Sequence, residues 1–313
     1  MLRLLAGRII AVVPVIGILL LLVFLLLRLT PGDPAAIIAG EAATPAQIAA
    51  IHARLGLDQP IWQQFIDWLA QLAHGDLGNS VFSGLPVTTL IASRIGPTFA
   101  LATTTILFAI GLAIPAGVLA AAHAGRLLDR ALIGASVLGF SFPLFWTGYL
   151  LVLLFAVHWR ILPVQGYQSP GDSVGGFATH MVLPTVTLGL AYTALLARMT
   201  RAAMIEALGQ DFIRTARAKG LSPTRILFVH ALKSAAVPIV TTIGLGLATL
   251  LGGTVVTETI FAIPGLGRLA VDSIQTHDFP VIQGLILFFA CIYILLNLLI
   301  DFSYLLLDPR LRR

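Results

Sequence analysis

Six long apolar runs without charge constrain this chain more than any other feature of its sequence. A membrane-crossing helix needs about 20 apolar residues, with a usual range of about 17–25. Each run falls near or above this range and contains no Lys, Arg, Asp or Glu. The runs are Ile9–Leu27, Phe99–Ala122, Ala131–Val157, Met181–Ala197, Ala235–Thr257 and Val281–Leu299. One charge at the centre of a spanning helix costs roughly 2.5–3.5 kcal/mol, so we expect an all-α membrane protein with six transmembrane helices.

The composition agrees with this expectation. Only 11% of the 313 residues are charged and 58% are hydrophobic, whereas a soluble domain usually has about a quarter charged residues. The first run is longer than the 7–15 residues of a signal-peptide core, and no small-residue cleavage site follows it. We therefore interpret Ile9–Leu27 as a retained transmembrane helix.

The distribution of basic residues predicts the orientation. With a cytoplasmic N-terminus, most of the 19 lysines and arginines fall on the cytoplasmic side, as the positive-inside rule requires. Only Arg28, Arg54, Arg94, Arg160 and Arg268 fall outside. An even number of spans also makes the C-terminus cytoplasmic. The basic character of the chain therefore reports topology, and we expect no nucleic-acid partner.

The sequence contains no evident nucleotide-binding, metal-binding or catalytic motif. Neither lysine, Lys219 or Lys233, follows the glycine pattern of a phosphate-binding loop. The seven histidines lack the spacing of a metal site on a helix face, so we expect no metal and no catalytic residue. A single cysteine, Cys291, permits no internal disulfide, and we expect its thiol to be packed.

The segment after the first run predicts two short helices. Thr44-Pro45-Ala46-Gln47 is a capping box with proline at the first helical position, and this helix would end at Gly56. A second helix would begin near Pro60 and lie at the membrane surface or against the spans. Its apolar face would carry Ile61, Phe65, Trp68, Leu69 and Leu72.

The segment 198–234 predicts a short helix, a sharp turn and a second helix. Gly220 would end the helix Asp211–Lys219, and Ser222-Pro223 would begin the next one. The apolar face would consist of Phe212, Ile213 and Ala216, while Arg214, Arg217 and Lys219 would face water or a partner. A basic loop that only fixes topology is the plainer alternative.

Three features of the later spans are candidates for packing or for a solute path. Gly244, Ala248 and Gly252 recur every four residues and predict close helix packing. Pro115 and Pro143 would kink the second and third spans. The possible path or outer-mouth residues are Glu258, Pro264, Gly265, Gly267, Asn297 and Asp301. For Asp301, four residues after Asn297 on one helix face, a structural role is favoured over a proton relay.

The inner segment resembles the coupling loop of ABC importer permeases, and specifically those of the dipeptide, oligopeptide and nickel type. Ala216, Gly220 and Leu232 match the general motif, while Arg214 and His230 replace its Glu and Ile. The matching residues are Asp211, Phe212, Ile213, Arg214, Thr215, Ala216, Arg217, Ala218, Lys219, Gly220, Leu221, His230 and Leu232.

The resemblance extends over nearly the whole chain. Further similar stretches are Thr30–Pro34, Glu258–Phe261, Pro264–Arg268, Asn297–Asp301 and Leu307–Arg310. It implies a type I importer permease fold in the plasma membrane of a bacterium or archaeon. The segments would be an N-terminal helix (1–28), an extracytoplasmic segment (29–98), a five-helix core (99–305) that includes the coupling loop, and a cytoplasmic tail (306–313).

The resemblance also implies partners. They would be a second, related permease, two cytoplasmic ATPase subunits that use ATP and Mg, an extracytoplasmic binding protein and the lipid bilayer. This chain would bind no cofactor and hydrolyse no ATP. The expected solutes are dipeptides or oligopeptides, with nickel or glutathione as alternatives. A secondary transporter is the alternative of a different class, but it predicts buried acids within the spans, and the runs contain none.

Overall fold

The structure is a computed structural model that describes residues 2–28, 35–36 and 44–307. Within these residues the chain is helical, and its only extended pairing is an isolated bridge between Asn79 and Pro86. The all-α prediction is confirmed. The helices are α1 (Leu2–Arg28), α3 (Pro45–Leu55), α4 (Ile61–Ala73), α5 (Val87–Ala122), α6 (Leu127–Ser141), α7 (Leu144–Leu151), α8 (Val174–Leu208), α9 (Asp211–Ala218), α10 (Pro223–Arg225), α11 (Leu232–Ser234), α12 (Ala236–Ile260), α13 (Leu266–Gln275) and α14 (Phe279–Leu307).

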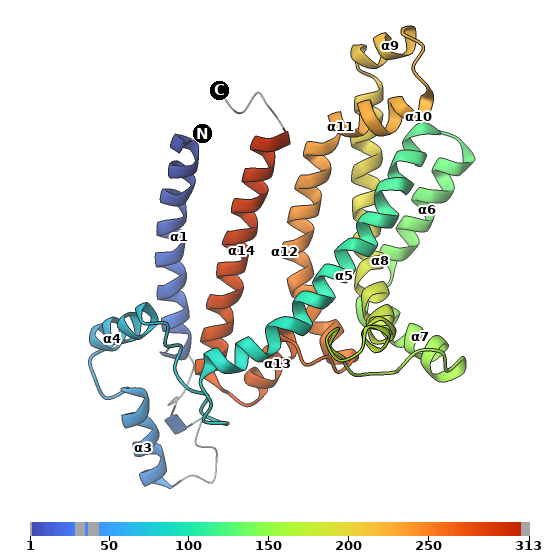
Figure 1. Cartoon of the computed structure of the whole chain (residues 1–313). Coiled ribbons are helices and arrows are strands. Elements are labelled where there is room, and N and C mark those ends of the chain that lie inside the picture. The colour runs from blue at the N-terminus through green and yellow to red at the C-terminus, as the bar shows by residue number, and fades with distance from the viewer. Residues whose placement is uncertain (1, 29–34, 37–43, 308–313) are drawn as a thin grey trace. The chain divides into compact units, whose positions relative to one another are not determined.

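Two π-helical turns complete the element order. Val152–His158 (η1) continues α7, and Ile226–Ala231 (η2) joins α10 to α11. All six apolar runs fall on these helices (Figure 1). By length and composition, α5, α8 and the Phe279–Ser303 part of α14 could each cross a membrane, and Val12–Leu26 forms a shorter apolar helix. The total of six spans remains a prediction.

The third apolar run is bent at Pro143, and the kink predicted there is confirmed as a break between two helices. Leu127–Ser141 and Leu144–His158 meet at an angle of 97°. Pro143 is the N-cap of α7, and Phe142 before it is extended, because a residue before proline is disfavoured in the α conformation. Pro115, in contrast, lies inside the continuous helix α5.

The chain divides into two compact units, Met1–Gly96 with Arg268–Leu295 and Pro97–Gly267 with Leu296–Arg313. In the first unit, α4 packs against α1. The Phe24 ring is 2% exposed and lies 4.9 Å from the Phe65 ring and 5.7 Å from the Trp68 ring. The predicted capping box at Thr44 and the left-handed C-cap at Gly56 are confirmed. Ile61, on the predicted apolar face of α4, is 53% exposed.

The other end of the first unit is tied by Asp278. Its carboxylate accepts hydrogen bonds from the Ser80 hydroxyl at 2.5 Å and from the Val81 amide at 3.1 Å. Asp278 and Ser80 are both buried. The turn between α13 and α14 is therefore fixed to the turn before α5.

The second unit is built around α8, which packs against α6, α7 and α12. A side chain on Gly189 would collide with Phe108 of α5, and one on Gly246 of α12 would overlap the Tyr192 ring. In the first unit, Cys291, expected to be packed, is exposed on α14. An exposed apolar face suits a helix that contacts lipid or another chain.

A buried ion pair joins α6 to α8. Asp129 is 3% exposed, and its two carboxylate oxygens accept from Arg201 Nε at 2.5 Å and from Arg201 Nη2 at 2.7 Å. The Gly125 amide donates a third bond at 2.8 Å. Sequence reasoning had used Arg201 only as an orientation signal and missed this pair.

We predict that Asp129→Asn and Arg201→Gln each lower the melting temperature of the detergent-purified chain. The double variant should lose less than the sum of the two single losses, because each single change removes the same bidentate interaction. Circular dichroism melts give the comparison. Additive losses would contradict a direct energetic coupling between the two side chains.

Candidate functional site

The coupling segment, residues 198–234 of the second unit, contains a short, exposed helix, α9 (Figure 1). Gln210 is its N-cap and Lys219 its C-cap. Gly220 follows with φ +73°, a left-handed conformation that glycine adopts without steric cost. Its amide donates to the Arg217 carbonyl at 2.9 Å. The predicted helix, stop and Pro223 restart are confirmed.

The apolar face of α9 is divided between the inside and the outside. Ile213 and Ala216 are buried and pack toward η2, with exposed fractions of 0% and 6%. Phe212 is 42% exposed. Two of the three residues of the predicted apolar face therefore fix α9 to its own chain, and only Phe212 is left exposed.

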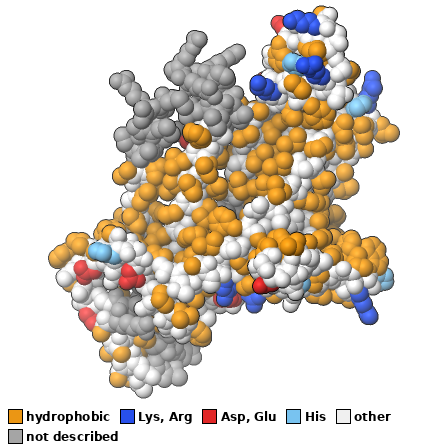
Figure 2. Space-filling model, viewed as in Figure 1, with side chains coloured by type: hydrophobic (Ala, Val, Ile, Leu, Met, Phe, Trp, Pro, Cys, Tyr) orange, Lys and Arg blue, Asp and Glu red, His pale blue; other side chains and the backbone are white. Residues whose placement is uncertain are grey.

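The outer surface of α9 is basic. The side chains of Arg214, Arg217 and Lys219 are exposed there, and Figure 2 shows Lys and Arg gathered over this end of the unit. Arg214 lies 3.4 Å from Asp211 in an exposed pair that contributes little to stability. A partner would thus meet one aromatic side chain among several positive charges.

Five further residues of the predicted coupling loop differ in their exposure and position. Thr215 and Ala218 are exposed on α9. His230 and Leu232 lie beyond the turn, in η2 and α11, and are half-buried. Leu221 is also half-buried, and its amide donates to the Ala216 carbonyl at 3.3 Å. The two halves of the motif are thus brought together by the packing of α9 on η2.

The outer loop between α12 and α13 is built around Glu258. Its side chain is fully buried and accepts a hydrogen bond from Thr98 Oγ1 at 2.6 Å. The same hydroxyl accepts from the Leu266 amide at 2.8 Å, so Thr98 uses its proton for Glu258 and its lone pair for the loop. This corrects the expectation that Glu258 lines the outer mouth.

Two glycines make room for this carboxyl group. A Cβ on Gly265 would overlap the Glu258 carboxyl group, and a Cβ on Gly267 would lie 2.6 Å from Val255 Cα. Both glycines are buried, whereas Pro264 is half-buried. The Pro264–Gly267 motif is therefore required for close packing, and Thr98, which no motif had marked, is its third component.

The remaining candidate path residues lie elsewhere. Asn297 and Asp301 are half-buried on one face of α14. Ile300 of the same stretch contacts the α12 backbone at Gly244, where a side chain would collide with it. Gly244 precedes Glu258 by roughly 20 Å of helix, at 1.5 Å per residue. Glu258 and the Asn297–Asp301 face therefore do not form one site.

The three residues of the predicted small-residue stripe on α12 differ in how closely they pack within the chain. Gly244 is buried against Ile300, Ala248 is half-buried, and Gly252 is exposed with open space around it. Gly246 and Gly253, outside the stripe, make the close contacts with α8, at Tyr192 and Leu188.

Family models match most of the chain. The model described as binding-protein-dependent transport system inner membrane component matches residues 113–313, and the N-terminal model of such membrane components matches residues 1–86. The chain belongs to this family. It is a multi-pass membrane component of a transport system, as the sequence resemblance indicated.

Similar proteins from bacteria support the family assignment. A probable peptide ABC transporter permease of Sinorhizobium fredii is 46% identical over 97% of both chains. The dipeptide transport system permease DppB of Escherichia coli is 41% identical over 100% of this chain and 99% of its own length. The glutathione transport system permease GsiC of Escherichia coli is 42% identical over the same shares.

A solved structure supports the fold. An inward-facing structure of the MetNI methionine ABC transporter aligns with a TM-score of 0.59 at 20% identity. The alignment covers 71% of this chain and 97% of the MetNI chain. The importer permease fold expected for this family is therefore confirmed.

We predict that Gly265→Ala destabilises the chain by about 1–3 kcal/mol, because the new methyl group must displace the buried Glu258 carboxyl group. Gly134→Ala is the matched control, since Gly134 is an exposed helical glycine with open space around it. It should be neutral or slightly stabilising. Urea unfolding in detergent compares the two variants, and equal stability would contradict the packing role of Gly265.

Proposed function

We propose that this chain is the permease subunit of an ATP-driven importer of dipeptides or oligopeptides. The observation that carries the proposal is the exposed α9 with its Phe212 and basic residues, within a fold of the importer permease family. The chain contains no phosphate-binding motif, so nucleotide hydrolysis would belong to partner ATPase subunits that use ATP and Mg.

The geometry of the coupling segment suits the transmission of motion. Ile213 and Ala216 fix α9 to η2. The helical stretch Pro223–Ser234 then meets Ala236–Leu250 of α12 at an angle of 62°. If an ATPase subunit pulled on α9, this bent connection would move with it. The motion would then be passed to α12 without the unfolding of any helix.

The remaining partners follow from the same proposal. A second, related permease would cover exposed surfaces of the spans and complete the solute path. An extracytoplasmic binding protein would deliver the solute to the outer segment. In this arrangement the termini and α9 face the cytoplasm of a bacterium or archaeon.

The peptide class is supported by the names of two of the relatives, which are described as peptide and dipeptide permeases. Glutathione is the second candidate solute, because GsiC is equally similar over its full length. Both are small peptides with free charged ends, so uptake competition between dialanine and glutathione distinguishes them.

We predict that Phe212→Ala reduces ATP-dependent peptide uptake by roughly tenfold or more, because a central aromatic anchor of an interface typically contributes about 2 kcal/mol. The variant should fold and reach the membrane normally, since the side chain is exposed. Uptake into proteoliposomes and recovery of the ATPase subunits measure the effect.

Phe302→Ala is the matched control, because Phe302 is 45% exposed on α14, against 42% for Phe212. It should leave uptake unchanged. Normal uptake by Phe212→Ala would contradict the role of α9. Phe212 is a better position for this test than Ala216. Ala216 is buried, so a charged residue there would disrupt the folding of the segment itself.

A further inference from the structure

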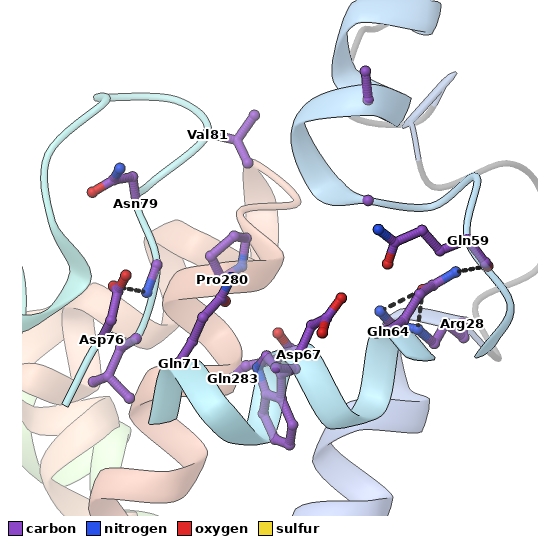
Figure 3. A pocket seen from close by; sticks show the side chains of 15 residues that line it. Arg28, Gln59, Gln64, Asp67, Gln71, Asp76, Asn79, Val81, Pro280 and Gln283 are labelled. Carbon is purple, nitrogen blue, oxygen red and sulfur yellow. Dashed lines mark hydrogen bonds between the residues drawn. The ribbon is translucent and has the colours of Figure 1, made fainter. Parts of the chain in front are cut away.

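A polar cavity lies within the first unit, lined by α4, the end of α1, the turn after α4 and the start of α14 (Figure 3). Its volume is about 420 Å³, within the range of about 300–1,000 Å³ that is usual for small-molecule sites. All its lining residues belong to one compact unit. Neither the family motifs nor the coupling segment accounts for it.

Arg28 provides a fixed positive charge in this cavity. Its Nε and Nη2 donate to Gln64 Oε1 at 2.9 and 2.7 Å, and its Nη1 donates to the Phe24 carbonyl at 3.0 Å. The guanidinium also lies 3.6 Å from the centre of the Phe24 ring. A guanidinium stays charged at neutral pH. A guanidinium has five N–H donors, so donors remain for a carboxylate.

Asp67 provides an uncommitted negative charge. It shares one face of α4 with Gln64 and Gln71, three and four residues away, and Figure 3 shows its carboxylate in the middle of the cavity. Among the described residues it has no hydrogen-bond or ion-pair partner, and it is exposed. Asp76 lies to one side of it in Figure 3 and Arg28 to the other, and Asp76 already accepts from the Gly78 amide at 2.8 Å.

Side-chain amides form most of the remaining polar lining. Gln59, Gln71, Asn79 and Gln283 each bring both a donor and an acceptor. Gln283 is held in place because its Nε2 donates to the Val23 carbonyl at 2.9 Å. Amide groups match the alternating N–H and C=O of a peptide backbone, which a site for a simple ion does not require.

We propose that this cavity is a receiving site for a short peptide, with the peptide ammonium at Asp67 and its carboxylate toward Arg28. The inference rests on the proposed function, because it assumes that the solute is a peptide. Two carboxylates and one guanidinium favour a zwitterionic ligand over an anion. The open, polar lining favours weak binding, which suits a site that passes its ligand onward.

The test is equilibrium binding of labelled dialanine to the full-length chain in lipid nanodiscs. Dialanine with acetylated and amidated ends, which has the same backbone without charged ends, should bind at least tenfold more weakly. Asp67→Asn should weaken dialanine binding about fivefold, the effect expected for an exposed charge pair of about 1 kcal/mol. Asp172→Asn, an exposed carboxylate outside the cavity, should leave binding unchanged.

Equal binding of free and blocked dialanine, or full binding by Asp67→Asn, would overturn the proposal. Uptake by the assembled transporter separates this failure from a failure of the proposed function. ATP-dependent import of dialanine without binding at the cavity would retain the importer and reject the receiving site. Absence of dialanine and glutathione import by the assembled transporter would reject the peptide class itself.

Discussion

The lack of water inside a bilayer is the constraint on which this structure depends. Every backbone N–H and C=O in the hydrocarbon must find a partner within the protein, and long apolar helices satisfy this locally. The chain therefore consists of helices such as α5, α8 and α14, with charges placed outside their apolar runs. The buried pair Asp129–Arg201, just outside two such runs, is tolerated because each charge is neutralised by the other.

Two breaks between helices mark parts of the chain whose role is not to cross the membrane. The loop after α12 is buried, and the Leu266 amide in it donates to the Thr98 hydroxyl, which in turn donates to Glu258. The break at Gly220 is exposed, and its left-handed glycine costs no strain. One break thus fixes a junction, and the other leaves a short helix exposed at the surface.

Sequence reasoning predicted the elements that depend on local patterns. The apolar runs, the capping box at Thr44 and the stop at Gly220 each follow from residues close together in the chain. It did not predict α13, or the contacts between distant residues such as Thr98 with Glu258. A buried threonine 160 positions from its carboxylate partner leaves no local pattern. The division of the α9 apolar face into buried and exposed residues also depends on contacts with η2. The helical periodicity of the α9 sequence does not predict these contacts.

The central claim is that this chain provides a solute path and a docking helix, while partner subunits hydrolyse the ATP. The most direct test is peptide uptake into liposomes by the purified chain, with and without the subunits that co-purify with it from its own membranes. The account predicts that ATPase subunits co-purify and that uptake requires both these subunits and ATP. Uptake by the chain alone, without ATP, would contradict it.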